Sequence, residues 1–210
     1  AVGVVLDGFA ACGNVAQCHE LLNALGPHFG LTPDQFIAGM LIKAYAVAAQ
    51  CGTPGGMLPA SPVLDAAHRT GGRNNTGLGE YTDSTDMLAE AKRLLLSIHA
   101  VVGVAPDLVS FCTVMRAYST RGDVATCREL LHAMQTQYGI APDTRAANEL
   151  VRAHVMAGEL DTARRMLWRM EGELGVRPDV ATFNTVLRGL CQAGDLTGAH
   201  KLVDAMQTEF

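Results

Sequence analysis

The chain is poor in aromatic residues, which make up 5% of its 210 residues and include a single tryptophan. No apolar run reaches the roughly 18 residues that a membrane-spanning helix needs, so we expect no membrane partner. Apolar residues nevertheless make up 49% of the chain. Ala, Leu, Val and Met must therefore fill the core, which favours closely packed helices.

The motifs of common enzyme and metal sites are also missing. The six cysteines form no Cys-x-x-Cys pair, and the sequence has no His-Glu-x-x-His, phosphate-loop or nucleophile-elbow motif. We interpret His154 as a hydrogen-bonded residue at the edge of the core, because it stands at an apolar helix position. These absences favour a protein that is not an enzyme and needs no metal or other cofactor.

A short motif recurs along the chain: an apolar residue, Gly, an apolar residue, any residue, then Pro-Asp. Its four copies begin at Phe29, Val102, Tyr138 and Leu174, and the last three prolines are 36 residues apart. A fixed period of this size is typical of stacked repeats. The fold that we expect is therefore all-α, a right-handed α-solenoid of stacked helix-turn-helix repeats.

Each unit reads as two amphipathic helices separated by a glycine. In the last unit Phe183, Val186 and Leu190 share one face of the first helix. The second helix has a small residue at a fixed position, which we place in the core: Cys18, Cys127, Ala163 and Ala199. Asp or Asn follows most of the intervening glycines and can cap the second helix. The glycine of the recurrent motif can end it.

The period predicts five units, at residues 1–34, 35–107, 108–143, 144–179 and 180–210, the first and last of them truncated. The second unit is 37 residues too long, and the excess is a Gly/Pro-rich insertion at about 50–85. We expect this insertion to be a loop that a partner protein orders. Neither end resembles a polar capping unit, so the array is expected to continue.

The run from Pro178 to Gly194 has an aromatic residue at the fourth position after Pro-Asp, Asn at the fifth and Gly near the fifteenth. It resembles the pentatricopeptide repeat, and Pro106 to Met134 matches nearly as well. The resemblance implies an organellar protein whose groove binds single-stranded RNA, one base per repeat.

The resemblance also implies which residues read bases. In that family the fifth residue of a repeat reads the base edge together with the last residue, and the second packs against the base. The candidates are Asn148 with Asp179, Cys112 with Asp143, Asn184, and Arg145 at a second position. Gly3 and Gly39 stand at fifth positions and offer no side chain, so most units depart from the code. Each aspartate could instead be a helix N-cap, and both readings stay open.

Aligning the units by their Pro-Asp pairs shows two ladders of basic residues in a chain of net charge −5. The first ladder stands at the ninth position, on the face of the fifth, and could follow RNA phosphates: Lys43, Arg116, Arg152 and Arg188. The second ladder lies on the other helix: His19, Lys92, Arg128, Arg164 and His200. The alternative for both ladders is a solvated face paired with acidic neighbours.

We therefore expect a non-catalytic RNA-binding protein of an organellar matrix, the mitochondrion being favoured over the chloroplast. Its role would be structural, as an adaptor in a ribonucleoprotein such as an organellar ribosome, with ribosomal or single-stranded RNA and proteins as partners. The alternatives are a sequence-specific RNA processing, stability or translation factor, a protein–protein scaffold, and the RNA-docking part of a larger RNA-processing enzyme.

Overall fold

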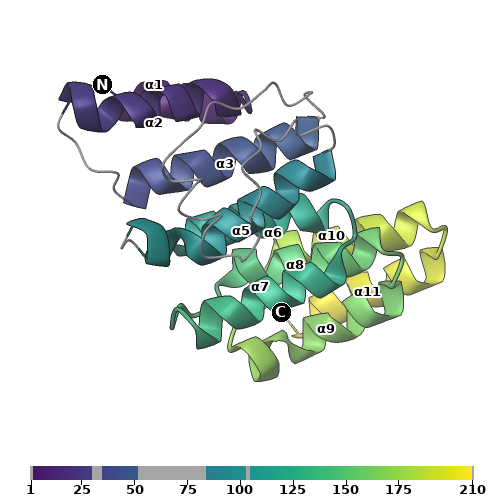
Figure 1. Ribbon diagram of the computed structural model, residues 1–210. Coiled ribbons are helices and arrows are strands. Elements are labelled where there is room, and N and C mark those ends of the chain that lie inside the picture. Colours follow the sequence, from purple (N-terminus) through teal and green to yellow (C-terminus); the bar gives the residue numbers. More distant parts are fainter. Residues whose placement is uncertain (1, 30–34, 52–83, 103–104, 210) are drawn as a thin grey trace. The chain divides into compact units, whose positions relative to one another are not determined.

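The computed structural model describes residues 2–29, 35–51, 84–102 and 105–209. This part of the chain forms ten helices and no strand, which confirms the all-α prediction (Figure 1). The first Pro-Asp motif and nearly all of the Gly/Pro-rich insertion lie outside the described residues. No helix of the described part is long and apolar enough to cross a membrane.

The chain divides into two compact units, and the boundary between Ala117 and Tyr118 falls within one helix, α6 (Leu108–Ser119). The first unit contains α1 (Val2–Ala11), α2 (Val15–Phe29), α3 (Gln35–Cys51) and α5 (Ser84–Val102). In this unit α1 packs against α2 and α3, and α3 packs against α2 and α5. Helices of consecutive repeats are therefore stacked side by side.

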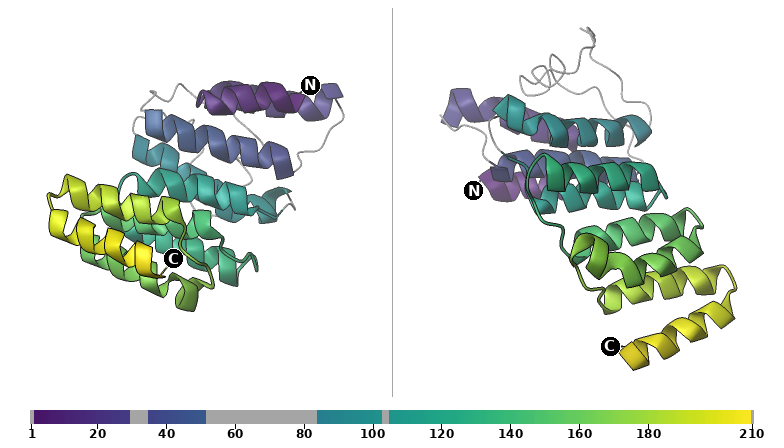
Figure 2. Two further views of the ribbon diagram at one scale, coloured as in Figure 1. Left: turned by 180° about the vertical axis from the view of Figure 1, so that it is seen from behind. Right: turned by 90° about the horizontal axis from the view of Figure 1, so that it is seen from below.

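The second unit contains α7 (Val124–Thr136), α8 (Thr144–Met156), α9 (Leu160–Leu174), α10 (Val180–Gln192) and α11 (Leu196–Glu209). Helix α8 contacts α7, α9 and α10, and α10 also contacts α9 and α11. Figure 2 shows α8 to α11 as neighbouring antiparallel helices joined by short turns. The first helices of two repeats, α8 and α10, thus lie directly against each other.

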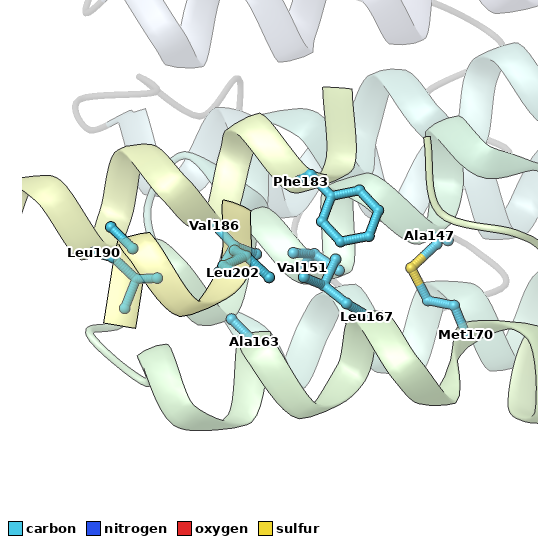
Figure 3. Close-up of a cluster of buried hydrophobic side chains, with 10 residues drawn as sticks. Ala147, Val151, Ala163, Leu167, Met170, Phe183, Val186, Leu190 and Leu202 are labelled. Atoms are coloured by element: carbon cyan, nitrogen blue, oxygen red, sulfur yellow. The ribbon is translucent and has the colours of Figure 1, made fainter. Parts of the chain in front are cut away.

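One hydrophobic cluster joins α8 to α11 in the second unit (Figure 3). Phe183 of α10 is 2% exposed and lies among aliphatic side chains of α8 and α9. Ala163 and Ala199 contribute the small residues that let the helix axes approach closely. The burial of Cys18 and Cys127 at the same repeat position confirms that these cysteines are core residues.

The Pro-Asp motifs place an N-cap at the start of a helix, as their sequence predicts. The Asp143 carboxylate accepts the Ala146 N–H at 2.9 Å, and the Asp179 carboxylate accepts the Thr182 N–H at 2.8 Å. At the other end of the repeat, Gly175 ends α9 with φ of +67°, and its N–H donates to Glu171 O. Glycine adopts this left-handed conformation without strain, which explains its place in the motif.

The turns between paired helices also behave as predicted. Asn14, Asp123 and Asp195 accept backbone N–H groups at the start of the following helix. Gly122, with φ of +72°, lies so close to the next turn that an added Cβ would be 2.9 Å from Ala157 N. Consecutive turns of the second unit are therefore in backbone contact at this point.

Candidate nucleic-acid interface

A groove of about 390 Å³ runs between α8 and α10 in the second unit. Each helix contributes one basic candidate and one base-reading candidate to its lining: Arg152 and Asn148 from α8, and Arg188 and Asn184 from α10. Repeat periodicity explains the arrangement, because residues 36 positions apart occupy equivalent places on stacked helices. The lining residues are Asn148, Arg152, Val155, Met156, Ala181, Asn184, Thr185, Arg188, Gly189 and Gln192.

The charge of the groove comes from Arg152 and Arg188. Arg152 lies 3.4 Å from Glu149, a buried carboxylate that also accepts the Ser119 hydroxyl at 2.6 Å. Arg188 is exposed and has no hydrogen-bond or ion-pair partner among the described residues. Two arginines line one groove, and Glu149, the carboxylate beside Arg152, does not line it, so the groove has an excess of positive charge for an anion.

The amides of the groove lie near these cations. Asn148 Oδ1 accepts a hydrogen bond from the Thr185 hydroxyl at 3.2 Å, which joins α8 to α10. Asn184 is exposed at the same groove. Sequence reasoning did not single out Thr185, Met156 or Gln192. Thr185 could have been found, since it directly follows the fifth position of its repeat.

The aspartates at the ends of the repeats do not line the α8–α10 groove. The Asp179 carboxylate accepts the backbone N–H of Thr182, and the Asp179 N–H donates to the Thr182 hydroxyl oxygen, which completes a capping box. Asp143 caps α8 and also accepts from Arg145 Nε at 2.8 Å. Burial alone would raise the pKa of Asp143, but the hydrogen bonds from Ala146 and Arg145 hold it below its ordinary value of 3.8. Both carboxylates are therefore already engaged as caps.

The candidates of the first unit differ from those of the α8–α10 groove. Lys43 Nζ lies 2.6 Å from Asp7 Oδ1, the residue 36 positions earlier, so its charge is already paired. Arg116 is exposed, and Cys112 is half-buried on the same helix. The spacing of this ion pair shows directly that ninth positions of consecutive repeats are neighbours.

The second ladder does not form a continuous basic surface, and the prediction for His19 was wrong. His19 is completely buried, with Nε2 3.0 Å from the Tyr45 hydroxyl, and burial lowers its pKa from 6.5 to about 4. It is therefore neutral at physiological pH. The others lie nearer to solvent: Lys92 is half-buried, Arg128 and His200 are exposed, and Arg164 pairs with Asp161 at 3.2 Å.

His154 lies at the edge of the core, as its place at an apolar helix position predicts. It is 2% exposed, and its Nδ1 lies 2.8 Å from Glu159 Oε2. Glu159 makes this contact in place of a cap on α9. Within the described ranges no three His, Cys, Asp or Glu side chains are grouped as metal ligands.

Family models match the second half of the chain. Two described as PPR repeat match residues 109–137 and 174–207, and one described as pentatricopeptide repeat domain matches residues 129–187. The matched residues, 109–207, are repeats of the pentatricopeptide repeat (PPR) family. The α8–α10 groove lies wholly within the matched region. No curated protein sequence matches the chain.

Solved structures resemble this PPR chain in fold. The PPR domain of Arabidopsis thaliana protein-only RNase P 1, in complex with tRNA, is 15% identical with a TM-score of 0.57, over 99% of this chain and 90% of that one. Arabidopsis thaliana nuclear protein-only RNase P 2 is 11% identical with a TM-score of 0.58, over 98% of this chain and 37% of that one. These likenesses confirm the helical-repeat solenoid.

The maize PPR protein PPR10 is 15% identical, with a TM-score of 0.47, over 98% of this chain and 33% of its own. This PPR chain thus spans about a third of PPR10 and of RNase P 2.

Proposed function

We propose that the chain binds single-stranded RNA in the α8–α10 groove, with phosphates at Arg152 and Arg188 and bases beside Asn148 and Asn184. One observation carries this proposal: the two arginines and the two amides line a single groove between stacked helices. A strand that advances one nucleotide per repeat would place successive phosphates at equivalent ninth positions. RNA binding by other members of the PPR family supports the same function.

Within RNA binding, we propose a structural adaptor role in an organellar ribonucleoprotein, such as a mitochondrial ribosome. Asp143 and Asp179 are occupied as helix caps, which leaves few groups to read sequence. Charge-based contacts to phosphates carry no sequence information, yet they supply much of the affinity. Such a protein would bind RNA mainly through its phosphates and would discriminate little between sequences.

A second candidate is the RNA-docking part of an RNA-processing enzyme. It is favoured by two solved structures with TM-scores above 0.5, both of them protein-only RNase P and one of them in complex with tRNA. The chain would then supply the contact with a folded RNA, and another domain would supply the chemistry.

Charge reversal tests the groove. We expect Arg152→Glu with Arg188→Glu to lower the affinity for a single-stranded RNA. The slope of log affinity against log salt concentration should become shallower by about 1.4, which is the contribution of two phosphate contacts. The matched control is Arg177→Glu with Lys201→Glu, which changes the net charge equally at exposed residues outside the groove. If both double variants bind alike, the groove is not the RNA site.

Density-gradient sedimentation and RNA crosslinking separate the two candidates. An adaptor of the ribosome would co-sediment with a ribosomal subunit and crosslink to its RNA. Crosslinks to tRNA precursors, with no protein in the ribosomal fractions, would contradict the adaptor role and support the enzyme-docking role. Crosslinks confined to one messenger RNA would instead indicate a sequence-specific factor.

A further inference from the structure

A second groove, of about 550 Å³, lies between α7 and α9 and shares no residue with the α8–α10 groove. Its floor contains Leu131 of α7 and Leu150 of α8, each 4% exposed. Met166 and Leu174 of α9 are half-buried beside them. The second helices of two consecutive repeats thus border a depression with an aliphatic floor.

The rim of this α7–α9 groove is basic in an acidic protein. Arg128, Arg165 and Arg169 line it together with one carboxylate, Glu173, whereas the whole chain carries a net charge of −5. Arg128 has no hydrogen-bond or ion-pair partner among the described residues. Arg165 has only a long contact of 3.4 Å to Thr162 Oγ1. Two guanidinium groups of the rim therefore lack a carboxylate.

An ion pair within the chain shows that a guanidinium group of this rim can bind a carboxylate. Arg169 forms an ion pair with Glu173, one turn further along α9, so a carboxylate already occupies part of the rim. The floor beneath is closed by His154, whose ring is held by Glu159. The aliphatic floor is complementary to apolar side chains, and the arginine rim is complementary to carboxylates. A ligand that carries apolar side chains on one face and carboxylates on the other would fit both.

We propose that the α7–α9 groove binds an acidic amphipathic helix of a partner protein. The partner's apolar residues would cover Leu131, Leu150 and Met166, and its carboxylates would pair with Arg128 and Arg165. This is the helix-in-groove mode of recognition, in which one helical face supplies the anchors. An RNA backbone has phosphates for the rim but no aliphatic groups for the floor, so it fits less well.

Fluorescence anisotropy with designed peptides tests the proposal. The probe is a labelled peptide of about 15 residues, with leucines at helical positions i, i+3, i+4 and i+7 and glutamates elsewhere. We expect it to bind, whereas a peptide with lysines in place of the glutamates does not. Replacing Arg128, Arg165 and Arg169 with Glu should weaken binding by about tenfold or more, because it converts the attractions of Arg128 and Arg165 into repulsions and adds a third negative charge to the rim.

The control is the Arg152→Glu, Arg188→Glu variant, which should keep its peptide affinity although it is designed to lose RNA. The triple variant should show the reverse pattern, so failure of this proposal is distinguishable from failure of the RNA site. Methyl chemical shifts of Leu131, Leu150 and Met166 should move with the acidic peptide. No peptide binding, binding that the triple variant retains, or shifts of these methyls with oligouridine would each overturn the proposal.

Discussion

The Thr185 hydroxyl lies 3.2 Å from the Asn148 side-chain oxygen and 2.8 Å from the Ala181 carbonyl oxygen, so its single proton serves two acceptors. Whenever it donates to Asn148, it fixes that amide with its nitrogen available to the groove. An amide donor matches the O4 acceptor of uridine and not the N4 donor of cytidine.

We therefore expect Thr185→Val to reduce the preference for uridine over cytidine by about threefold, the worth of one hydrogen bond. Binding of oligonucleotides that differ at one base measures it. The matched control is Thr113→Val, since Thr113 donates to the carbonyl of Val109 and has an equivalent place in its own repeat. Equal effects of the two substitutions would show that Thr185 does not orient Asn148.

The ion pair between Lys43 and Asp7 predicts unequal contributions from the first ladder. Lys43→Ala should leave RNA affinity within about twofold, because its ammonium group is already neutralised by a carboxylate. Arg188→Ala should weaken binding several times more. Asp7→Asn should increase the affinity by releasing Lys43. Titration with one RNA at fixed salt compares the three variants, and a loss with Lys43→Ala equal to that with Arg188→Ala would contradict this ranking.

Substitutions at Asp179 distinguish its two candidate roles, helix cap and base-reading residue. Asp179→Ala should lower the free energy of unfolding by about 1 kcal/mol, since α10 loses its cap. Asp179→Asn should restore stability, because asparagine caps equally well, and it should leave base preference unchanged. Urea unfolding and oligonucleotide binding measure the two effects. A changed base preference in a fully stable Asp179→Asn protein would assign Asp179 to base reading.

Burial of His19 predicts a dependence of stability on pH. Its pKa is about 4 in the folded chain, against 6.5 for an ordinary histidine, so the unfolded chain binds the proton first as pH falls. This contribution to stability is complete above pH 6.5 and is lost as pH falls towards 4. Between pH 6.5 and 5 the free energy of unfolding should drop by about 2 kcal/mol.

Urea unfolding at these two pH values checks the prediction for His19. His19→Gln should be less stable at neutral pH but should lose most of the pH dependence. His200→Gln is the control, since this histidine is exposed, and it should keep the wild-type dependence. A wild-type chain that is equally stable at pH 6.5 and pH 5 would contradict the burial of an uncharged His19.

The features that the sequence predicted well are local ones. Asp143, Asp179 and Gly175 act on backbone groups within a few residues, so their types and spacing predict caps and helix ends directly. The period alone predicted that Arg152 and Arg188 occupy equivalent positions on neighbouring repeats. Even the burial of Cys127 could be predicted, because alanine takes the same place in later repeats.

Features that depend on a particular neighbour could not be predicted in this way. His19 shares a repeat position with Lys92 and Arg128, but a tyrosine hydroxyl lies beside it and the surrounding helices bury it. The α7–α9 groove depends on the spacing of two helices that no repeat pattern encodes. Periodicity predicts which residues are equivalent, and it does not predict which equivalent residues are exposed.

The contact between Gly122 and Ala157 sets a limit on how repeats can be exchanged. The two backbones approach so closely there that a side chain does not fit between the two turns. A repeat that carried alanine at this glycine could still fold as a hairpin, but it would hold its neighbour farther away at that end. Chimeric arrays that join these two repeats should therefore retain this glycine if the spacing between their turns is to be kept.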